Sequence, residues 1–160
     1  MSFTVTSTDF SDGGVLPDAQ VKALGNISPQ LSWSGAPEGT KSFAVTCYDP
    51  DAPTGSGFWH WTVANIPADV AALAADAGAV GGANLPKGVV QGRTDYGEAG
   101  FGGAAPPPGH GPHRYIFTVF AVDVDRLDVN EDNSGAVFGF NLHFHTLAKT
   151  SITATYENRG

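Results

Sequence analysis

Alternation of apolar and polar residues is the clearest pattern along this chain, and it predicts strands. Successive side chains of a strand point to opposite faces of its sheet, so a half-buried strand alternates with a period of two. The alternating stretches are residues 3–8, 27–33, 42–48, 59–66, 114–124 and 151–156. Clusters of Gly, Pro, Asn and Asp separate them, as is typical of turns between strands.

The stretch 42–48 illustrates the pattern. Phe43, Val45 and Cys47 fall on one face, and the residues between them fall on the other. The sequence Asp-Pro-Asp-Ala-Pro follows at 49–53 and ends the strand, because proline has no N–H to donate to a sheet. Cys47 lies within this alternation, so we expect a small core residue rather than a nucleophile.

Two segments have helical character instead. Residues 70–77 are rich in alanine and predict a turn or two of helix. Residues 135–150 place Val137, Phe140 and Phe144 near one stripe, which predicts a helix. With so few helices, the sequence predicts a mostly β fold resembling a β-sandwich.

Length and composition agree with one domain spanning residues 1–160. The chain is 41% hydrophobic and 15% charged, and it contains 21 Gly and 11 Pro. This is enough apolar material for a sizeable core, with the glycine and proline expected of many turns.

The net charge of −8 limits the classes of molecule that the protein is expected to bind. Nucleic acids and anionic membranes attract Lys and Arg, so a chain this acidic is a poor match for either. No apolar run approaches the roughly 18 residues of a membrane helix. The single Cys47 excludes an intrachain disulfide, and the N-terminal residues do not resemble a signal peptide. We therefore expect a cytoplasmic protein, and any anion it binds must be held by local groups.

The acidic turn at 49–53 is the first candidate for chemistry. His60 follows it closely, and a nearby carboxylate favours the charged imidazolium and orients the ring. The alternative is an ordinary turn, in which each aspartate binds its own backbone.

The proline-rich segment 105–115 is the second candidate. His113 and Tyr115 are two residues apart at the start of a strand, so they point to the same side. Arg114 points to the other side, where we expect a structural carboxylate. The segment predicts a pocket wall, and the alternative is a core tyrosine beside a loop histidine.

His143 and His145 form the third candidate. In a strand they would share a face and could bind a metal, whereas in a helix they lie about 200° apart and cannot converge. The helical pattern favours the second reading. The chain has no G-x-S-x-G elbow, phosphate loop, dinucleotide fingerprint or zinc spacing. We accordingly expect no cofactor, no resident metal and no enzymatic turnover.

Taken together, the motifs resemble the phosphatidylethanolamine-binding protein family. They are D-P-D-A-P at 49–53, W-H-W at 59–61 and P-P-P-G-H-G-P-H-R-Y at 106–115. The segments N-I-S-P-Q-L-S-W at 26–33, G-R-T-D-Y-G at 92–97 and F-H-T-L-A-K at 144–149 are similar to its bacterial branch, the Raf kinase inhibitor-like proteins.

The resemblance implies a large antiparallel sheet packed on a smaller one, with a shallow pocket at one end. In the family this pocket takes phosphate, carboxylate or phosphorylated groups. Bacterial relatives also imply a homodimer as one oligomeric state. The residues that match the family's pocket motifs are Asp49, Pro53, His60, Ala105, Pro106, His113 and Tyr115.

Three functions follow as hypotheses. The first is a binding protein for a small phosphate- or carboxylate-bearing ligand, with His60, His113, the Tyr115 hydroxyl and loop N–H groups as donors. Asp49 would hold a histidine in its charged form, or accept from a protonated ligand oxygen or an ammonium. The second is an interaction protein that inhibits a kinase or a protease. The third is a metal-assisted hydrolase that uses Asp49, Asp51, His60 and His113.

Overall fold

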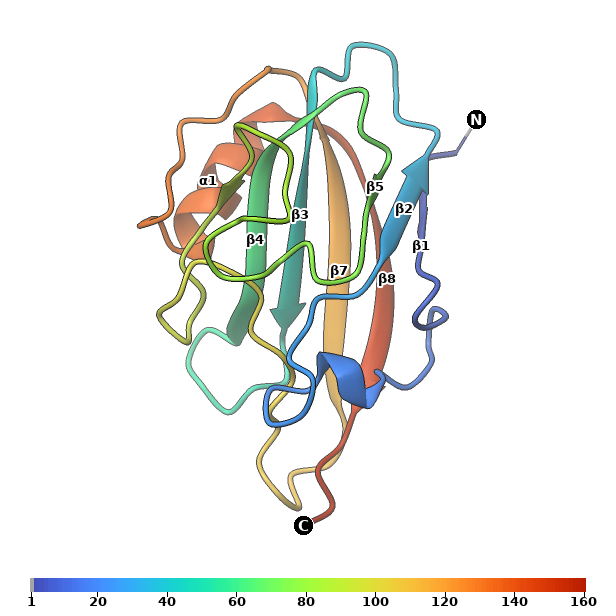
Figure 1. Cartoon of the computed structure of the whole chain (residues 1–160), viewed down its shortest axis with the longest axis vertical. Helices are drawn as coiled ribbons and strands as arrows, with labels where there is room; N and C mark the ends of the chain where they lie inside the picture. Colours follow the sequence, from blue (N-terminus) through green and yellow to red (C-terminus); the bar gives the residue numbers. More distant parts are fainter. Residues whose placement is uncertain (1) are drawn as a thin grey trace.

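Two antiparallel sheets and one α-helix make up the computed structural model, which describes residues 2–160. The larger sheet has the strand order β6-β4-β3-β7-β8, and the smaller has the order β1-β2-β5 (Figure 1). The elements are β1 (Thr4–Thr6), the short 3₁₀ helix η1 (Asp18–Gln20), β2 (Leu31–Ser34), β3 (Ser42–Asp49), β4 (Phe58–Pro67), β5 (Ala72–Leu73), β6 (Val90–Gln91), β7 (His113–Val122), α1 (Gly135–His145) and β8 (Thr146–Tyr156).

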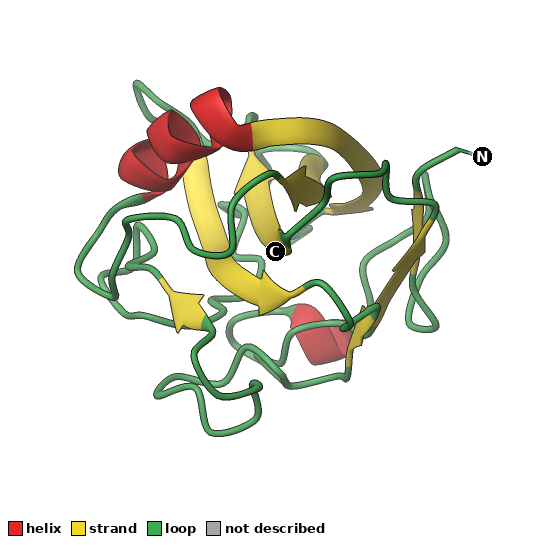
Figure 2. Ribbon diagram, turned by 90° about the horizontal axis from the view of Figure 1, so that it is seen from above, coloured by secondary structure: helices red, strands yellow, loops and turns green. Residues whose placement is uncertain are grey.

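The central strand β3 is buried on both faces and divides the core in two. Phe43 and Val45 pack with Trp33 of β2 in the larger cluster, which lies between the two sheets. Ala44 points the other way and packs with Phe138 of α1. Figure 2 shows α1 and the smaller sheet on different sides of the large sheet. The mostly β fold, with a large antiparallel sheet packed on a smaller one, is confirmed.

The boundary between the last helix and the last strand differs from the prediction. We expected a helix over 135–150, but α1 ends at His145 and β8 begins at once with Thr146. The backbone N–H and the Oγ1 of Thr146 both donate to the Leu142 carbonyl, which closes the helix. On the side of β7 that faces away from β3, the backbone groups of its ten residues need hydrogen-bonding partners, and β8 supplies them from Thr146 onward.

The helix predicted over 70–77 is wrong. Residues Ala72–Leu73 form β5, which pairs with Leu31 and Ser32 of β2. The Leu73 side chain is buried in the larger core cluster, and this contact with the smaller sheet overrides the weak helical preference of the alanines. The short elements η1 and β6 were not predicted, because two or three residues carry no periodic signal.

Four strands of the large sheet, β4, β3, β7 and β8, begin or finish at the same end of the sheet. β3 ends at Asp49, directly opposite Phe58 at the start of β4. β7 begins at His113, opposite Tyr156 at the end of β8. In Figure 1 this is the lower end of the sheet, close to the C-terminus. The sheet therefore brings the two candidate motifs of the sequence to one place.

The helix α1 carries exposed apolar side chains. Phe140 and Phe144 of α1 are 68% and 64% exposed, and their rings contact each other edge to face. Within residues 2–160, no helix combines the length and the apolar character that crossing a membrane requires.

Candidate functional site

A cavity of about 150 Å³ lies at the strand ends described above. β3, β4 and β7 supply its polar floor, and the loops after β3 and before β7 form its walls. Six of the seven predicted site residues line it: Asp49, Pro53, His60, Ala105, His113 and Tyr115.

The structure differs from the prediction at Pro106. Its side chain is buried and lines a neighbouring groove, together with Leu24 and Tyr156. Pro107 takes the expected place in the cavity wall. Ala105 and Pro107 belong to both hollows, so this short segment is the partition between them.

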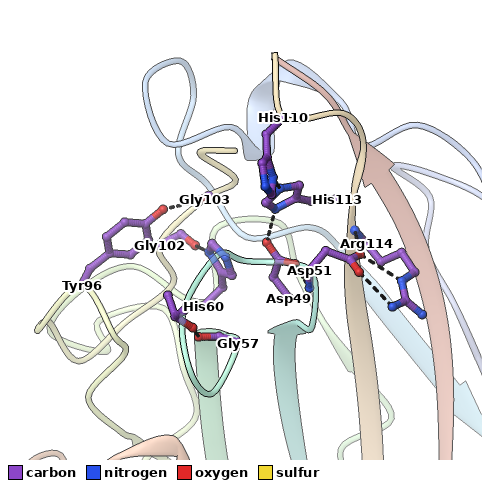
Figure 3. A network of polar contacts seen from close by, with 11 residues as sticks. Asp49, Asp51, Gly57, His60, Tyr96, Gly102, Gly103, His110, His113 and Arg114 are labelled. Atoms are coloured by element: carbon purple, nitrogen blue, oxygen red, sulfur yellow. Dashed lines mark hydrogen bonds and ion pairs between the residues drawn. The ribbon is translucent and has the colours of Figure 1, made fainter. Parts of the chain in front are cut away.

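Asp49 and His113 form a buried pair on the cavity floor. Nδ1 of His113 lies 2.7 Å from Oδ2 of Asp49, and both side chains are almost fully buried (Figure 3). A carboxylate only accepts, so Nδ1 carries the proton. Nε2 of His113 lies 2.6 Å from Nδ1 of His110, a residue on the exposed loop. Both ring nitrogens of His113 therefore have protein partners.

The second acidic residue of the turn points away from the cavity. Asp51 accepts two hydrogen bonds from the Arg114 guanidinium, each of 2.9 Å, and one from the Arg114 backbone N–H. These contacts lower the pKa of Asp51 to about 2, with the guanidinium hydrogen bond as the main cause. Asp51 is the structural carboxylate expected for Arg114. Its own backbone N–H donates to Oδ1 of Asp49, which ties the turn to the buried pair.

His60 is held in one tautomer by the loop that faces it. Its Nδ1 lies 2.8 Å from the Gly102 carbonyl, which only accepts, so Nδ1 carries the proton. The ring is buried, and burial lowers the pKa of His60 below its ordinary value. The sequence led us to expect an imidazolium here. The structure instead favours a neutral ring at neutral pH, because desolvation outweighs the nearby carboxylates.

Tyr115 contributes a hydroxyl without a protein partner. Its side chain is 1% exposed, and Oη makes no hydrogen bond within residues 2–160. Buried hydroxyls are nearly always hydrogen-bonded, because an unpaired one costs free energy. Burial, followed by the charge of Asp49, raises the pKa of Tyr115 well above its ordinary value, so the group stays a neutral hydroxyl.

Sequence reasoning missed part of the cavity wall. Phe58 and Tyr96 contact each other and His60 with their rings, at centroid distances between 4.7 and 5.6 Å. The Tyr96 hydroxyl donates to the Gly103 carbonyl, and burial raises the pKa of Tyr96 to about 12. The other unpredicted lining residues are Ala52, Thr54 and Pro107.

One glycine explains why this wall was hard to predict. A Cβ at Gly102 would overlap the Tyr96 ring, so the close approach of loop and ring needs glycine there. Nothing in the local sequence around Tyr96 indicates that contact, because it joins two parts of a long irregular loop.

Cationic side chains do not line the cavity. Nζ of Lys22 lies 4.5 Å from the Tyr96 ring centre, and Lys22 lines the neighbouring groove. Arg114 is engaged with Asp51. The cavity thus contains a buried carboxylate and two histidines but neither Lys nor Arg.

No three His, Cys, Asp or Glu side chains in residues 2–160 come together as a metal site. His143 and His145 lie in α1, so the helical reading of that pair is confirmed. Nδ1 of His145 instead contacts Oδ1 of Asp123 at 2.9 Å on the surface. Cys47 is buried, and burial raises the pKa of its thiol, as suits a core residue.

Comparison with known proteins places this chain in a family. The sequence profile described as phosphatidylethanolamine-binding protein matches residues 6–157. The chain belongs to the phosphatidylethanolamine-binding protein family. This confirms the resemblance inferred from the motifs at 49–53, 59–61 and 106–115.

Two bacterial relatives of the family are similar over their full length. UPF0098 protein YbhB of Escherichia coli strain K12 is 56% identical over 156 residues, which span 94% of this chain and 98% of YbhB. The crystal structure of E. coli YbcL, described as a new member of the mammalian PEBP family, has a TM-score of 0.95 at 53% identity. That match covers 97% of this chain and 98% of YbcL.

A more distant solved structure shows the same architecture. It is a phosphatidylethanolamine-binding protein homolog, CT736, from Chlamydia trachomatis, with a TM-score of 0.84 at 31% identity. The match covers 98% of both chains.

Proposed function

We propose that this protein binds a small ligand through a phosphate or carboxylate group held in the cavity, without turning it over. The observation that carries the proposal is Tyr115, a residue that lines the cavity and whose buried hydroxyl lacks a protein partner in residues 2–160. A ligand oxygen that accepts from this hydroxyl would remove the cost of leaving it unpaired.

The size of the cavity supports a headgroup rather than a whole lipid. Pockets for drug-sized ligands measure roughly 300–1,000 Å³, whereas this one measures about 150 Å³. The name of the family points to phosphatidylethanolamine, whose headgroup carries such a phosphate. A phosphorylated side chain of another protein offers the same group, so the shared chemistry is the phosphate.

The hydrolase hypothesis finds less support. It needs Asp49, Asp51, His60 and His113 around one point, but Asp51 is turned outward to Arg114. The cavity also lacks a hydroxyl paired with a base, since the Tyr115 hydroxyl makes no hydrogen bond to either histidine. Binding without turnover therefore fits the geometry better. Inhibition of a kinase or a protease stays a prediction from the sequence.

Calorimetric titration of phosphoethanolamine and of phosphotyrosine tests the proposal. The wild-type protein is compared with the cavity variant His60→Ala/His113→Ala and with the matched surface variant His143→Ala/His145→Ala. Circular dichroism and thermal unfolding establish that each protein is folded.

We expect saturable heat with the wild type and the surface variant, and none with a folded cavity variant. Absence of heat for both ligands with the folded wild type would refute a phosphate-binding cavity. Equal affinity in the cavity and surface variants would place the ligand elsewhere on the molecule.

A further inference from the structure

The hydrogen-bonding groups that face the cavity have an unusual balance for an anion site. Sites for fully ionised anions usually offer several donors, often from Arg or Lys. This cavity has neither, and it includes a buried carboxylate and a neutral imidazole. The balance decides which protonation state of a ligand fits.

His60 is the first acceptor. Because Nδ1 donates to the Gly102 carbonyl, the neutral ring carries a lone pair on Nε2 (Figure 3). The ring lines the cavity, and Nε2 is its nitrogen that does not bond to Gly102. A ligand next to this nitrogen must therefore present an O–H or N–H.

Asp49 is the second acceptor. One oxygen accepts from Nδ1 of His113 and the other from the Asp51 backbone N–H. Each carboxylate oxygen has a further lone pair, and the residue lines the cavity. Its negative charge, almost fully buried, repels a ligand that arrives without a proton of its own.

The donors are fewer. The Tyr115 hydroxyl can donate one hydrogen bond, and the backbone N–H of Ala105 has no acceptor among residues 2–160. The ring nitrogens of His113 are already engaged with Asp49 and His110. Two donors and the lone pair on Nε2 of His60 match an oxyacid that is ionised once, because its one remaining acidic hydrogen can donate to that nitrogen.

We infer that the cavity selects singly protonated oxyacids, above all phosphate monoesters as their monoanions, over anions that carry no proton. In this arrangement the P–O–H group donates to Nε2 of His60, and the other phosphate oxygens accept from the Tyr115 hydroxyl and the Ala105 N–H. The inference rests on the proposed phosphate-binding function and specifies the ligand's protonation state.

Charged groups around His60 do not reverse this preference. Asp49 of β3 and Asp95 of the facing loop both favour a charged ring, yet desolvation is the larger effect on its pKa. The titratable side chains whose rings contact His60 are Tyr96 of the loop and Tyr115 of β7, whose phenols stay neutral. His113 of β7 lines the same cavity, and its Nδ1 donates to Asp49. Lys22 contacts the Tyr96 ring but lines the neighbouring groove rather than this cavity.

Two ligand pairs of similar shape test the inference on the wild-type protein. They are phenyl phosphate with phenyl sulfate, and inorganic phosphate with sulfate, titrated calorimetrically at about pH 6 and about pH 8. Phosphate monoesters have a second pKa of about 6, so they keep a proton that sulfate esters have lost. We expect phenyl sulfate to bind at least a hundredfold more weakly than phenyl phosphate at about pH 6, because it has no hydrogen to donate to Nε2 of His60.

The affinity for phenyl phosphate should fall about fiftyfold between about pH 6 and about pH 8, as the monoanion decreases from about one half to about one hundredth of the ligand. A His60→Gln variant adds an amide donor and should reduce the preference for phosphate over sulfate to less than about tenfold. The exposed His145→Gln change should leave the preference intact.

Sulfate binding within about threefold of phosphate in the wild type would overturn the inference while leaving phosphate binding in place. An affinity for phenyl phosphate that does not change with pH would also overturn it. Absence of phenyl phosphate binding at both pH values would instead overturn the proposed function itself.

Discussion

Two aspartate–histidine pairs in this protein have nearly the same geometry and very different surroundings. Asp49 and His113 lie 2.7 Å apart with side chains 3% and 2% exposed, whereas Asp123 and His145 lie 2.9 Å apart with side chains 43% and 39% exposed. The first pair lines a cavity at the end of the large sheet, and the second joins the surface of α1 to the end of β7.

The contrast shows that burial, more than residue type, decides whether the polar atoms of such a pair need partners other than water. The charges of an exposed pair are screened by water, and water can take the place of either partner in the hydrogen bond. Water does not reach the buried pair in this way, so each of its polar atoms needs a protein or ligand partner. Asp49 and His113 bond to each other, and their other polar atoms bond to the Asp51 backbone N–H and to His110. The adjacent Tyr115 hydroxyl has no such partner within residues 2–160.

The largest expected effect comes from breaking the buried pair. Asp49→Ala leaves Nδ1 of His113 and the Asp51 N–H without their acceptor in a desolvated site. We expect the free energy of unfolding to fall by about 3 kcal/mol. The matched change Asp123→Ala should cost less than about 1 kcal/mol. Urea unfolding of both variants measures the difference, and similar losses would show that the two pairs are energetically equivalent.

Tyr115→Phe sharpens the comparison because it separates binding from stability. Removing the unpaired hydroxyl should leave the free energy of unfolding unchanged, or raise it by up to about 1 kcal/mol. The affinity for phenyl phosphate should fall about tenfold, since a hydrogen bond to a charged acceptor contributes about 1.5 kcal/mol. Tyr156→Phe, which lies outside the cavity, is the control for both measurements.

A marked loss of stability in Tyr115→Phe would mean that the hydroxyl has a structural partner. Unchanged affinity would mean that the ligand does not contact it.

The smallest effect concerns the exposed ion pair next to the cavity. The pKa of Asp51 is about 2 in the folded protein, below the ordinary value of about 3.9. A lowered pKa stabilises the fold above the unfolded value, and this stabilisation is lost as the pH falls towards about 2. Arg114→Gln should therefore lower the melting temperature by less than about 2 °C at neutral pH.

Thermal unfolding of wild type and Arg114→Gln at several pH values checks this prediction. The difference should shrink below about pH 4 and also at high salt. A difference that grew on acidification would show that some other interaction of Arg114 dominates.

Much of the site could be predicted from short motifs. The prolines at 50 and 53 predicted that a strand ends close to Asp49, and the period of two put His113 and Tyr115 on one side with Arg114 on the other. Tyr96 and His110 could not be predicted, because each reaches the site or its histidine from an irregular loop that shows no local pattern. Phe58 was missed although it lies two residues before His60 in β4, because the predicted strand began one residue too late, at Trp59. The helix predicted over 70–77 was wrong for a related reason, since pairing with β2 decides that segment.

The sequence alone determined the mostly β fold, the family and six residues of the cavity, because these depend on local alternation, on turn chemistry and on motifs. Only the tertiary structure decided where α1 ends and which side of the partition Pro106 occupies. It also decided the state of His60. That state depends on the Gly102 carbonyl, 42 residues away along the chain, and on desolvation by surrounding rings. Protonation responds to the three-dimensional environment of a group, which local sequence does not contain.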